Sequence, residues 1–322
     1  MTAKKSLTFE NINGLGLENG PTHYRIYDNY FRCVYGASPI MPNEQEDKDG
    51  SSLILQCVSL LQAAESLQGA QVVRLPIEAH LLRLNQVLWH HVEHNPEAWS
   101  DIGLRLQSPL IFREAMVYII GRWDLKGILA VRKNFLESQD SGTLVTELAI
   151  GKAHEMKEKK LNVERRLMEF YPTQMIHAET IEDVPGRAIY ATDIYLWQAL
   201  TLVRQYISCS YMANMHHRAP DGGANFYRCI GASGDAYLRK DTLERFHKSF
   251  AMSSKGKVCL AQAIEIIKDS LAPIANELLV DRTQVNRGPK DKPAYLLCAE
   301  FLDEELPWNA QAAKTALDRM EE

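Results

Sequence analysis

The chain has 322 residues, of which 46% are hydrophobic and 24% charged, and its formal net charge is −5. These values are typical of soluble globular proteins and leave room for one large core or two smaller ones. They argue against a nucleic-acid binder, because affinity for the phosphate backbone comes from abundant, clustered Lys and Arg.

No apolar run approaches the roughly 18 residues that a membrane-spanning helix requires. The N-terminal residues MTAKKSLTFENINGLG include basic side chains but no apolar segment behind them, unlike a secretory signal. The six cysteines occur singly, without a CxxC pair, and each is interpreted as a small buried hydrophobic residue in a reducing compartment. We therefore expect a protein of the nucleus or cytoplasm without a membrane segment.

One strand and two helices are predicted in the first 69 residues. Residues 6–9 give a weak strand signal, and a Gly- and Asn-rich loop follows. A helix is predicted over residues 22–36, with Gly36 at its C-terminus. Its apolar stripe is interpreted as facing the core and consists of Tyr24, Tyr27, Phe31 and Val34. After the acidic loop of residues 37–50, a serine cap predicts a helix that ends at Gly69.

The clearest pattern lies between residues 76 and 123. A helical face that ends near Asn95 and Pro96 is predicted from the spacing of Leu81, Leu84, Leu88 and Val92. Ser108 and Pro109 predict an N-cap and a first helical position for the next apolar helix. Four side chains are predicted to anchor the shared core, namely Trp89, Trp99, Phe112 and Trp123.

The sequence pattern also predicts helices in the second half of the chain. Helices are predicted after Gly127, over residues 143–171, 191–217 and 257–271, in a segment that Asp241 and Glu244 begin as a capping box, and at the charged C-terminal end. The long helix of residues 143–171 carries a seam for one partner helix, formed by Ala149, Ala153, Met156, Lys160, Val163, Leu167 and Phe170. His216 and His217 are expected at a helix C-terminus, where the helix dipole favours an imidazolium. We find no internal repeat and no βαβ alternation.

Catalytic signatures are weak throughout. His90 and His94 lie one helical turn apart and could share a metal, but the Glu of a zincin motif does not follow the first histidine, and no third ligand stands at a recognisable spacing. The segment GASGD at 231–235 has its second glycine too early for a nucleophile elbow, and PDGG at 220–223 lacks the GK[ST] ending of a phosphate loop. Both segments are interpreted as turns.

Five short segments of the chain together form one pattern: QVLW at 86–89, AW at 98–99, SP at 108–109, IFREA at 111–115, and residues 191–197. This pattern resembles a group of fungal BTB/POZ-like proteins of poorly defined function, over a span from about Tyr24 to Trp308. The resemblance implies a small sheet capped by helices that pairs with itself or with other proteins. It also implies links to transcription or to ubiquitin ligases of the cullin type. The strand hairpin and first helices that usually begin this fold are not visible before Thr22.

The sequence therefore predicts a mainly α-helical, multi-helical bundle, with a small BTB/POZ-like remnant in residues 1–95 and a helical extension in residues 96–322. The expected function is a non-enzymatic interaction or adaptor protein whose partners are other proteins or a second copy of itself. No catalytic, cofactor-binding or metal-binding residue is assigned, and no cofactor is expected. The alternative is an all-helical metal-binding protein or enzyme that uses His90 and His94. A DNA-linked regulator is a third hypothesis, and its binding would weaken steeply with salt.

Overall fold

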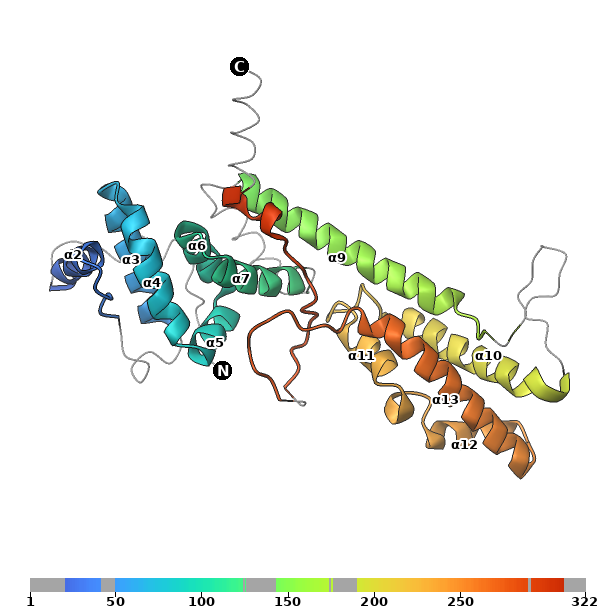
Figure 1. The fold of residues 1–322 in the computed structure, drawn as a ribbon. Coiled ribbons are helices and arrows are strands. Elements are labelled where there is room, and N and C mark those ends of the chain that lie inside the picture. The colour runs from blue at the N-terminus through green and yellow to red at the C-terminus, as the bar shows by residue number, and fades with distance from the viewer. Residues whose placement is uncertain are drawn as a thin grey trace, which may run out of the picture.

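The structure is a computed structural model that describes residues 21–41, 50–123, 125, 143–173, 175, 190–288 and 291–309. The first half of this chain is a packed group of helices (Figure 1). They are α2 (Pro21–Val34), α3 (Ser51–Ser66), α4 (Ala70–Arg83), α5 (Gln86–His94), α6 (Pro96–Leu106) and α7 (Pro109–Gly121). α3 contacts α2, α4 and α6, and α6 packs closely against α7.

The close crossing of α6 and α7 forms the centre of this half. A Cβ added at Gly103 would lie 2.7 Å from the backbone nitrogen of Phe112, so glycine is needed for the two helices to approach. Trp99 and Phe112 are completely buried there, and Trp89 and Trp123 are also buried. The prediction of four core anchors is confirmed.

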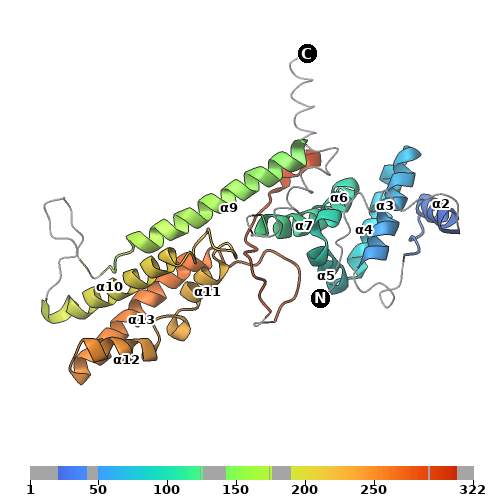
Figure 2. The same cartoon turned by 180° about the vertical axis from the view of Figure 1, so that it is seen from behind.

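The second half consists of longer helices. These are α9 (Thr143–Glu169), α10 (Tyr190–Met212), α11 (Ala224–Ala232), α12 (Lys240–Ser249) and α13 (Ser254–Asn276), with short 3-10 turns η1 (Gly234–Ala236) and η2 (Asp303–Glu305). α13 packs against α10, α11 and α9. The same arrangement is seen from behind in Figure 2.

Two features connect the halves. α9 contacts α7 in the first half and α13 in the second, so its buried seam serves two partner helices and not the single one expected. The segment that we call the strap, residues 277–309 without residues 289 and 290, returns from α13 to α7. Trp308 of the strap packs edge-to-face on Phe112, with ring centroids 5.5 Å apart.

Hydrogen bonds fix the strap on α5 and α7. The backbone nitrogen of Gln284 donates to both carboxylate oxygens of Glu114, at 3.0 and 2.9 Å. Arg287 donates to Glu93 at 2.9 Å and to the hydroxyl of Tyr118 at 2.7 Å. These hydrogen bonds join residues that are far apart in sequence, so they hold the strap against α5 and α7.

The described residues confirm the mainly helical fold class, and they contain no strand. No helix among them has the length and apolar character that crossing a membrane requires. The expected strand at residues 6–9, the helix after Gly127 and the charged C-terminal helix lie outside the described residues.

Several helix boundaries differ from the prediction. The face through Leu81 and Val92 belongs to two helices, because the chain turns at Leu84 and Asn85, where Asn85 adopts a φ of 49°. α13 continues through Pro273 to Asn276, beyond the predicted end at residue 271, and α4 also contains a proline, Pro76.

The apolar stripe of α2 was wrongly assigned to the core. Tyr24, Phe31 and Val34 are exposed, and Tyr27 is half-buried. The helix packs on α3 and α4 with its other side, through Asn29, Tyr30 and Cys33.

The expected boundary near residue 95 remains a prediction. Asn95 separates α5 from α6, and these two helices contact each other as well as α7. The buried apolar side chains of the described residues form one connected core that includes both halves.

Candidate interaction surface

The most distinctive surface in the second half is a basic region on α12 and the first turns of α13, which lie next to each other in both views (Figures 1 and 2). We call it the basic face, and its members are Arg239, Lys240, Arg245, Lys248, Lys255 and Lys257. All six side chains are exposed. Residues 239–257 contain these six cations and the carboxylates Asp241 and Glu244, so their net charge is +4 in a chain of net charge −5.

The cations of the basic face are largely unneutralised. Arg245 lies 3.9 Å from Asp241, but both side chains are about 70% exposed, so this pair contributes little. Within the described part of the chain, no carboxylate lies within ion-pair distance of Lys248, Lys255 or Lys257. Their charge is therefore available to a partner.

Apolar side chains stand among these cations. Phe250 is 61% exposed and stacks on Phe246, with ring centroids 4.8 Å apart and an interplanar angle of 25°. Val258, one residue after Lys257, is also exposed. Exposed aromatic side chains of this kind are enriched at protein-binding surfaces.

The local sequence explains why this face is held in position. Ser253 caps α13 by accepting a hydrogen bond from the Gly256 nitrogen at 3.1 Å. Gly256 allows a close approach to α10, because a Cβ there would lie 3.0 Å from the Tyr195 hydroxyl. The buried ammonium of Lys268 donates to the Gly234 carbonyl at 2.7 Å and pairs with Glu265 at 2.8 Å, which ties η1 to α13. The expected capping box of α12 is wrong: the N-cap is Arg239, without a side-chain cap.

A buried carboxylate joins α9 to the segment after α10 and to α11. Glu164 accepts hydrogen bonds from the backbone nitrogen of His217 at 2.9 Å and from the hydroxyl of Tyr227 at 2.6 Å. Its other oxygen lies 2.7 Å from the Nδ1 of His217. His217 is therefore positioned by α9 and not by a helix dipole, because α10 ends at Met212.

The structure does not bring His90 and His94 together as a metal site. The Nδ1 of His94 lies 2.8 Å from the carbonyl of His90, and the Nδ1 of His90 lies 3.7 Å from Glu93. Among the described residues, no group of three or more His, Cys, Asp or Glu side chains is placed to hold a metal ion.

The segment PDGG at 220–223 is a turn, as predicted, whereas GASGD at 231–235 consists of the end of α11, Ser233 and the start of the 3-10 helix η1. The Asp221 carboxylate accepts from the nitrogens of Gly223 and Asn225, both at 3.0 Å, and so shapes the start of α11. The Ser233 hydroxyl donates to Asp269 at 2.8 Å.

The six cysteines are unpaired, but they do not share one environment. Cys33, Cys57 and Cys298 are buried, as expected. Burial raises the pKa of Cys57 to about 12, so this thiol stays protonated. Cys209 is exposed, which contradicts the prediction that every cysteine is a buried hydrophobic residue.

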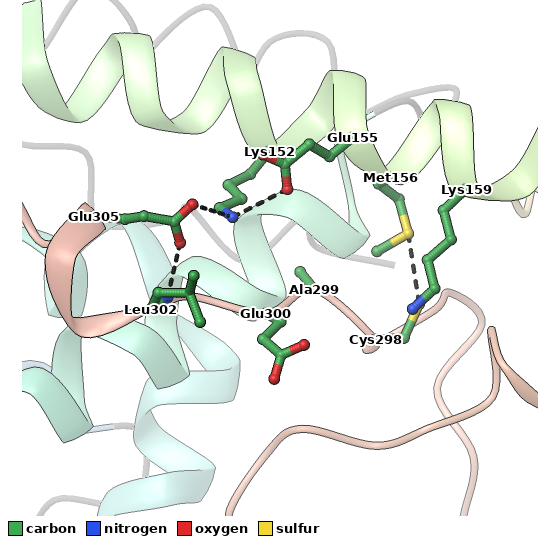
Figure 3. A pocket seen from close by; sticks show the side chains of 9 residues that line it. All are labelled: Lys152, Glu155, Met156, Lys159, Cys298, Ala299, Glu300, Leu302 and Glu305. Atoms are coloured by element: carbon green, nitrogen blue, oxygen red, sulfur yellow. Dashed lines mark hydrogen bonds and ion pairs between the residues drawn. The ribbon is translucent and has the colours of Figure 1, made fainter.

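A cavity of about 380 Å³ lies between α9 and the strap (Figure 3). Its main polar groups neutralise each other, because the Lys152 ammonium lies 3.0 Å from Glu155 and 2.6 Å from Glu305. Burial by itself would raise the pKa of Glu305. The hydrogen bond from Lys152 acts in the opposite direction, and the pKa of Glu305 is lowered below its ordinary value. We interpret the cavity as a seam between two elements, since the Lys152–Glu305 pair links α9 to the strap beside it.

The structure shows a multi-helical protein with an exposed basic face on α12 and the first turns of α13. Residues 172–277, which contain α10 to α13, match the model of the FF domain in its fungal form, a helical protein-interaction domain. No curated protein and no solved structure matches the chain.

The resemblance to fungal BTB/POZ-like proteins is therefore wrong. No BTB/POZ family model matches, and the model that does match describes a different helical domain at the opposite end of the chain. The links to transcription and to cullin-type ligases depended on that resemblance alone. The coarser conclusion, a helical region that resembles a protein-interaction domain, is supported.

Sequence reasoning missed the basic face. Its cations are spread over two helices and a connecting segment, so no continuous Lys/Arg block marks them. The signal that could have found them is local charge, since residues 239–257 are strongly positive within an acidic chain.

Proposed function

We propose that this protein is a non-enzymatic interaction or adaptor protein that binds other proteins through residues 172–277, with the basic face as the contact surface. The observation that carries the proposal is the set of exposed, unneutralised lysines around Phe250 on a region similar to an interaction domain. A partner that fits this surface is an acidic segment with an apolar or aromatic side chain, because its charges complement the lysines and its ring can contact Phe250.

The same proposal places the protein in the nucleus or cytoplasm. Its support is the state of the six cysteines, none of which forms a disulfide. Persistent disulfides are rare in these reducing compartments. The alternative metal-binding function has no observation in its favour, because His94 contacts a backbone carbonyl of its own helix.

The proposal is tested by fluorescence anisotropy with a labelled twelve-residue peptide of Asp and Glu around one central Trp. The double variant Lys248→Glu/Lys255→Glu is compared with the wild type. A matched control, Lys157→Glu/Lys292→Glu, changes the net charge equally at exposed lysines outside residues 172–277. We expect the first variant to bind at least about tenfold more weakly and the control to lose much less.

Salt provides a second criterion. Wild-type binding should weaken as ionic strength rises, because exposed charges are screened beyond about 8 Å at physiological salt. Equal binding by the two double variants would overturn the proposed surface. Absence of binding to every acidic peptide would overturn the proposed partner chemistry.

A further inference from the structure

One side of α2 carries three exposed aromatic rings, which we call the aromatic face and define by Tyr24, Phe31 and Tyr35. The exposed fractions of these side chains are 82%, 54% and 85%. Positions separated by seven and four residues lie on one side of a helix. Tyr35 follows the last residue of α2, but its nitrogen still donates to the Phe31 carbonyl at 3.0 Å, so it continues the helical turn.

The opposite side of α2 is fixed, so the aromatic face stays on the outside. The Asn29 amide accepts from the nitrogen of Ile40 at 2.8 Å and donates to its carbonyl at 3.0 Å. Tyr30 packs on the turn between α3 and α4, where a Cβ added at Gly69 would collide with its hydroxyl. Cys33 is buried beneath the helix.

The aromatic face is large for an open surface on one helix. At about 200 Å² per aromatic side chain, the three rings expose roughly 400 Å². The largest apolar patch on a typical monomer is about 300–600 Å² and is often functional. An apolar surface of this size on a single helix is suited to be covered by another segment.

The sequence places one apolar segment directly beside this surface. Residues 1–20 precede α2, which begins at Pro21. Asn19 and Gly20 favour turns, so the chain can reverse direction there and run back along α2. The apolar side chains in this segment, apart from Met1 and Ala3, are Leu7, Phe9, Ile12, Leu15 and Leu17.

The length of the segment matches the length of the aromatic face. Tyr24 and Tyr35 are eleven positions apart, which is about 16.5 Å at a rise of about 1.5 Å per helical residue. An extended chain covers about 16.5 Å in five steps of about 3.3 Å, so residues 12–17 are long enough to span the face. Three of these six residues are apolar, namely Ile12, Leu15 and Leu17.

Charge favours the same occupant over a second copy of α2. The charged side chains of α2 outside its masked start are Arg25, Asp28 and Arg32, so the helix has a net charge of +1. Two copies of a positive surface would repel each other when paired. Residues 6–20 have a net charge of −2, because their only charged side chains are Glu10 and Glu18. Opposite net charges favour contact between the two segments.

We therefore propose that residues 12–17 lie along α2 and cover the aromatic face of the same chain. A second protein can then reach this face only after it displaces the segment, which makes the contact autoinhibitory. The proposal does not depend on the proposed function, because it concerns a different surface from the basic face and is measured without any peptide.

The direct test is photo-crosslinking of the full chain, with the photoreactive amino acid benzoylphenylalanine in place of Leu15. We expect mass spectrometry to find the crosslink in residues 24–35, within a species at the monomer mass of 36.5 kDa. The same probe in place of Leu7, outside residues 12–17, is the control and should crosslink to residues 24–35 much less often. Crosslinks from position 15 only to other parts of the chain, or only in a species of twice the monomer mass, would overturn the proposal.

Nitration by tetranitromethane provides a second readout without a probe in the segment. We expect nitration of Tyr24 and Tyr35 to be about tenfold faster in Leu15→Ser/Leu17→Ser than in the wild type, because the serines cannot replace the apolar contact. The matched control Leu7→Ser/Phe9→Ser should react as the wild type does.

A buried tyrosine separates this effect from unfolding. Tyr227 is completely buried and should stay unmodified in the wild type and both variants as long as the fold is intact. Equal nitration of Tyr24 and Tyr35 in all three proteins would overturn the proposal.

Discussion

Replacing Arg287 tests whether the strap is an integral part of the fold. This side chain is 8% exposed and donates to Glu93 at 2.9 Å, to Tyr118 at 2.7 Å and to Thr283 at 2.6 Å. It also lies 3.0 Å from Asp281. Arg287→Ala would leave the Glu93 carboxylate and the Tyr118 hydroxyl without this donor in a partly dry environment.

Removing one member of a fully buried ion pair costs about 3–5 kcal/mol, and losing a hydrogen bond to a charged group costs about 1.5–3 kcal/mol. Glu93 and Asp281 are 24% and 42% exposed, so water compensates part of this loss. We therefore expect Arg287→Ala to lower the free energy of unfolding by about 2–3 kcal/mol. Urea denaturation followed by circular dichroism measures this change.

A neighbouring arginine provides the matched control. Arg282 pairs with Glu300 at 3.2 Å, and both side chains are about half exposed. Arg282→Ala should lower the free energy of unfolding by no more than about 0.5 kcal/mol. Hydrogen exchange should also show that the amides of Gln284 and Asn286, which donate to α7 and α5, lose protection only in Arg287→Ala. Equal losses of stability in the two variants would refute this account of the strap.

Three further predictions concern buried groups. Trp99→Ala should lower the free energy of unfolding by about 3–5 kcal/mol in thermal denaturation, and a loss below 1 kcal/mol would show that the indole is not a core anchor. Burial raises the pKa of Glu114 from 4.5 to about 7, although a backbone N–H of the strap opposes the shift. The folded state then binds this proton more readily than the unfolded state, so stability should fall as pH rises from 4.5 to about 7, and Glu114→Gln should remove that part of the pH dependence. A thiol reagent at pH 8 should modify exposed Cys209 in the native protein but Cys57 only after unfolding, and equal rates would contradict the burial of Cys57.

Local patterns in the sequence predicted the helices well where several signals coincided. Ser108 caps α7 by accepting from the Ile111 nitrogen, as the serine and proline pair predicted. The seam of α9 is buried, and even Lys160 in it is inside. The predicted helix end at residue 271 was wrong, because Pro273 removes a hydrogen bond without ending α13, whose packing on three other helices compensates for that loss.

The arrangement of surfaces could not be predicted from local patterns. Whether Tyr24 and Phe31 face inward depends on the place where Tyr30 docks, which is set by Gly69 about forty residues later. The contact between Gln86 and Asn286 joins residues that are 200 positions apart. The family was misjudged for a related reason, since short apolar motifs around tryptophans are common to many helical proteins and do not specify one.

The central claim is that this protein binds other proteins through the basic face. Affinity capture with quantitative mass spectrometry tests it most directly, with tagged wild type, Lys248→Glu/Lys255→Glu and the control Lys157→Glu/Lys292→Glu in parallel. We predict that a reproducible set of partners is captured by the wild type and the control and is lost from the first variant. The same set captured by all three proteins would contradict the claim.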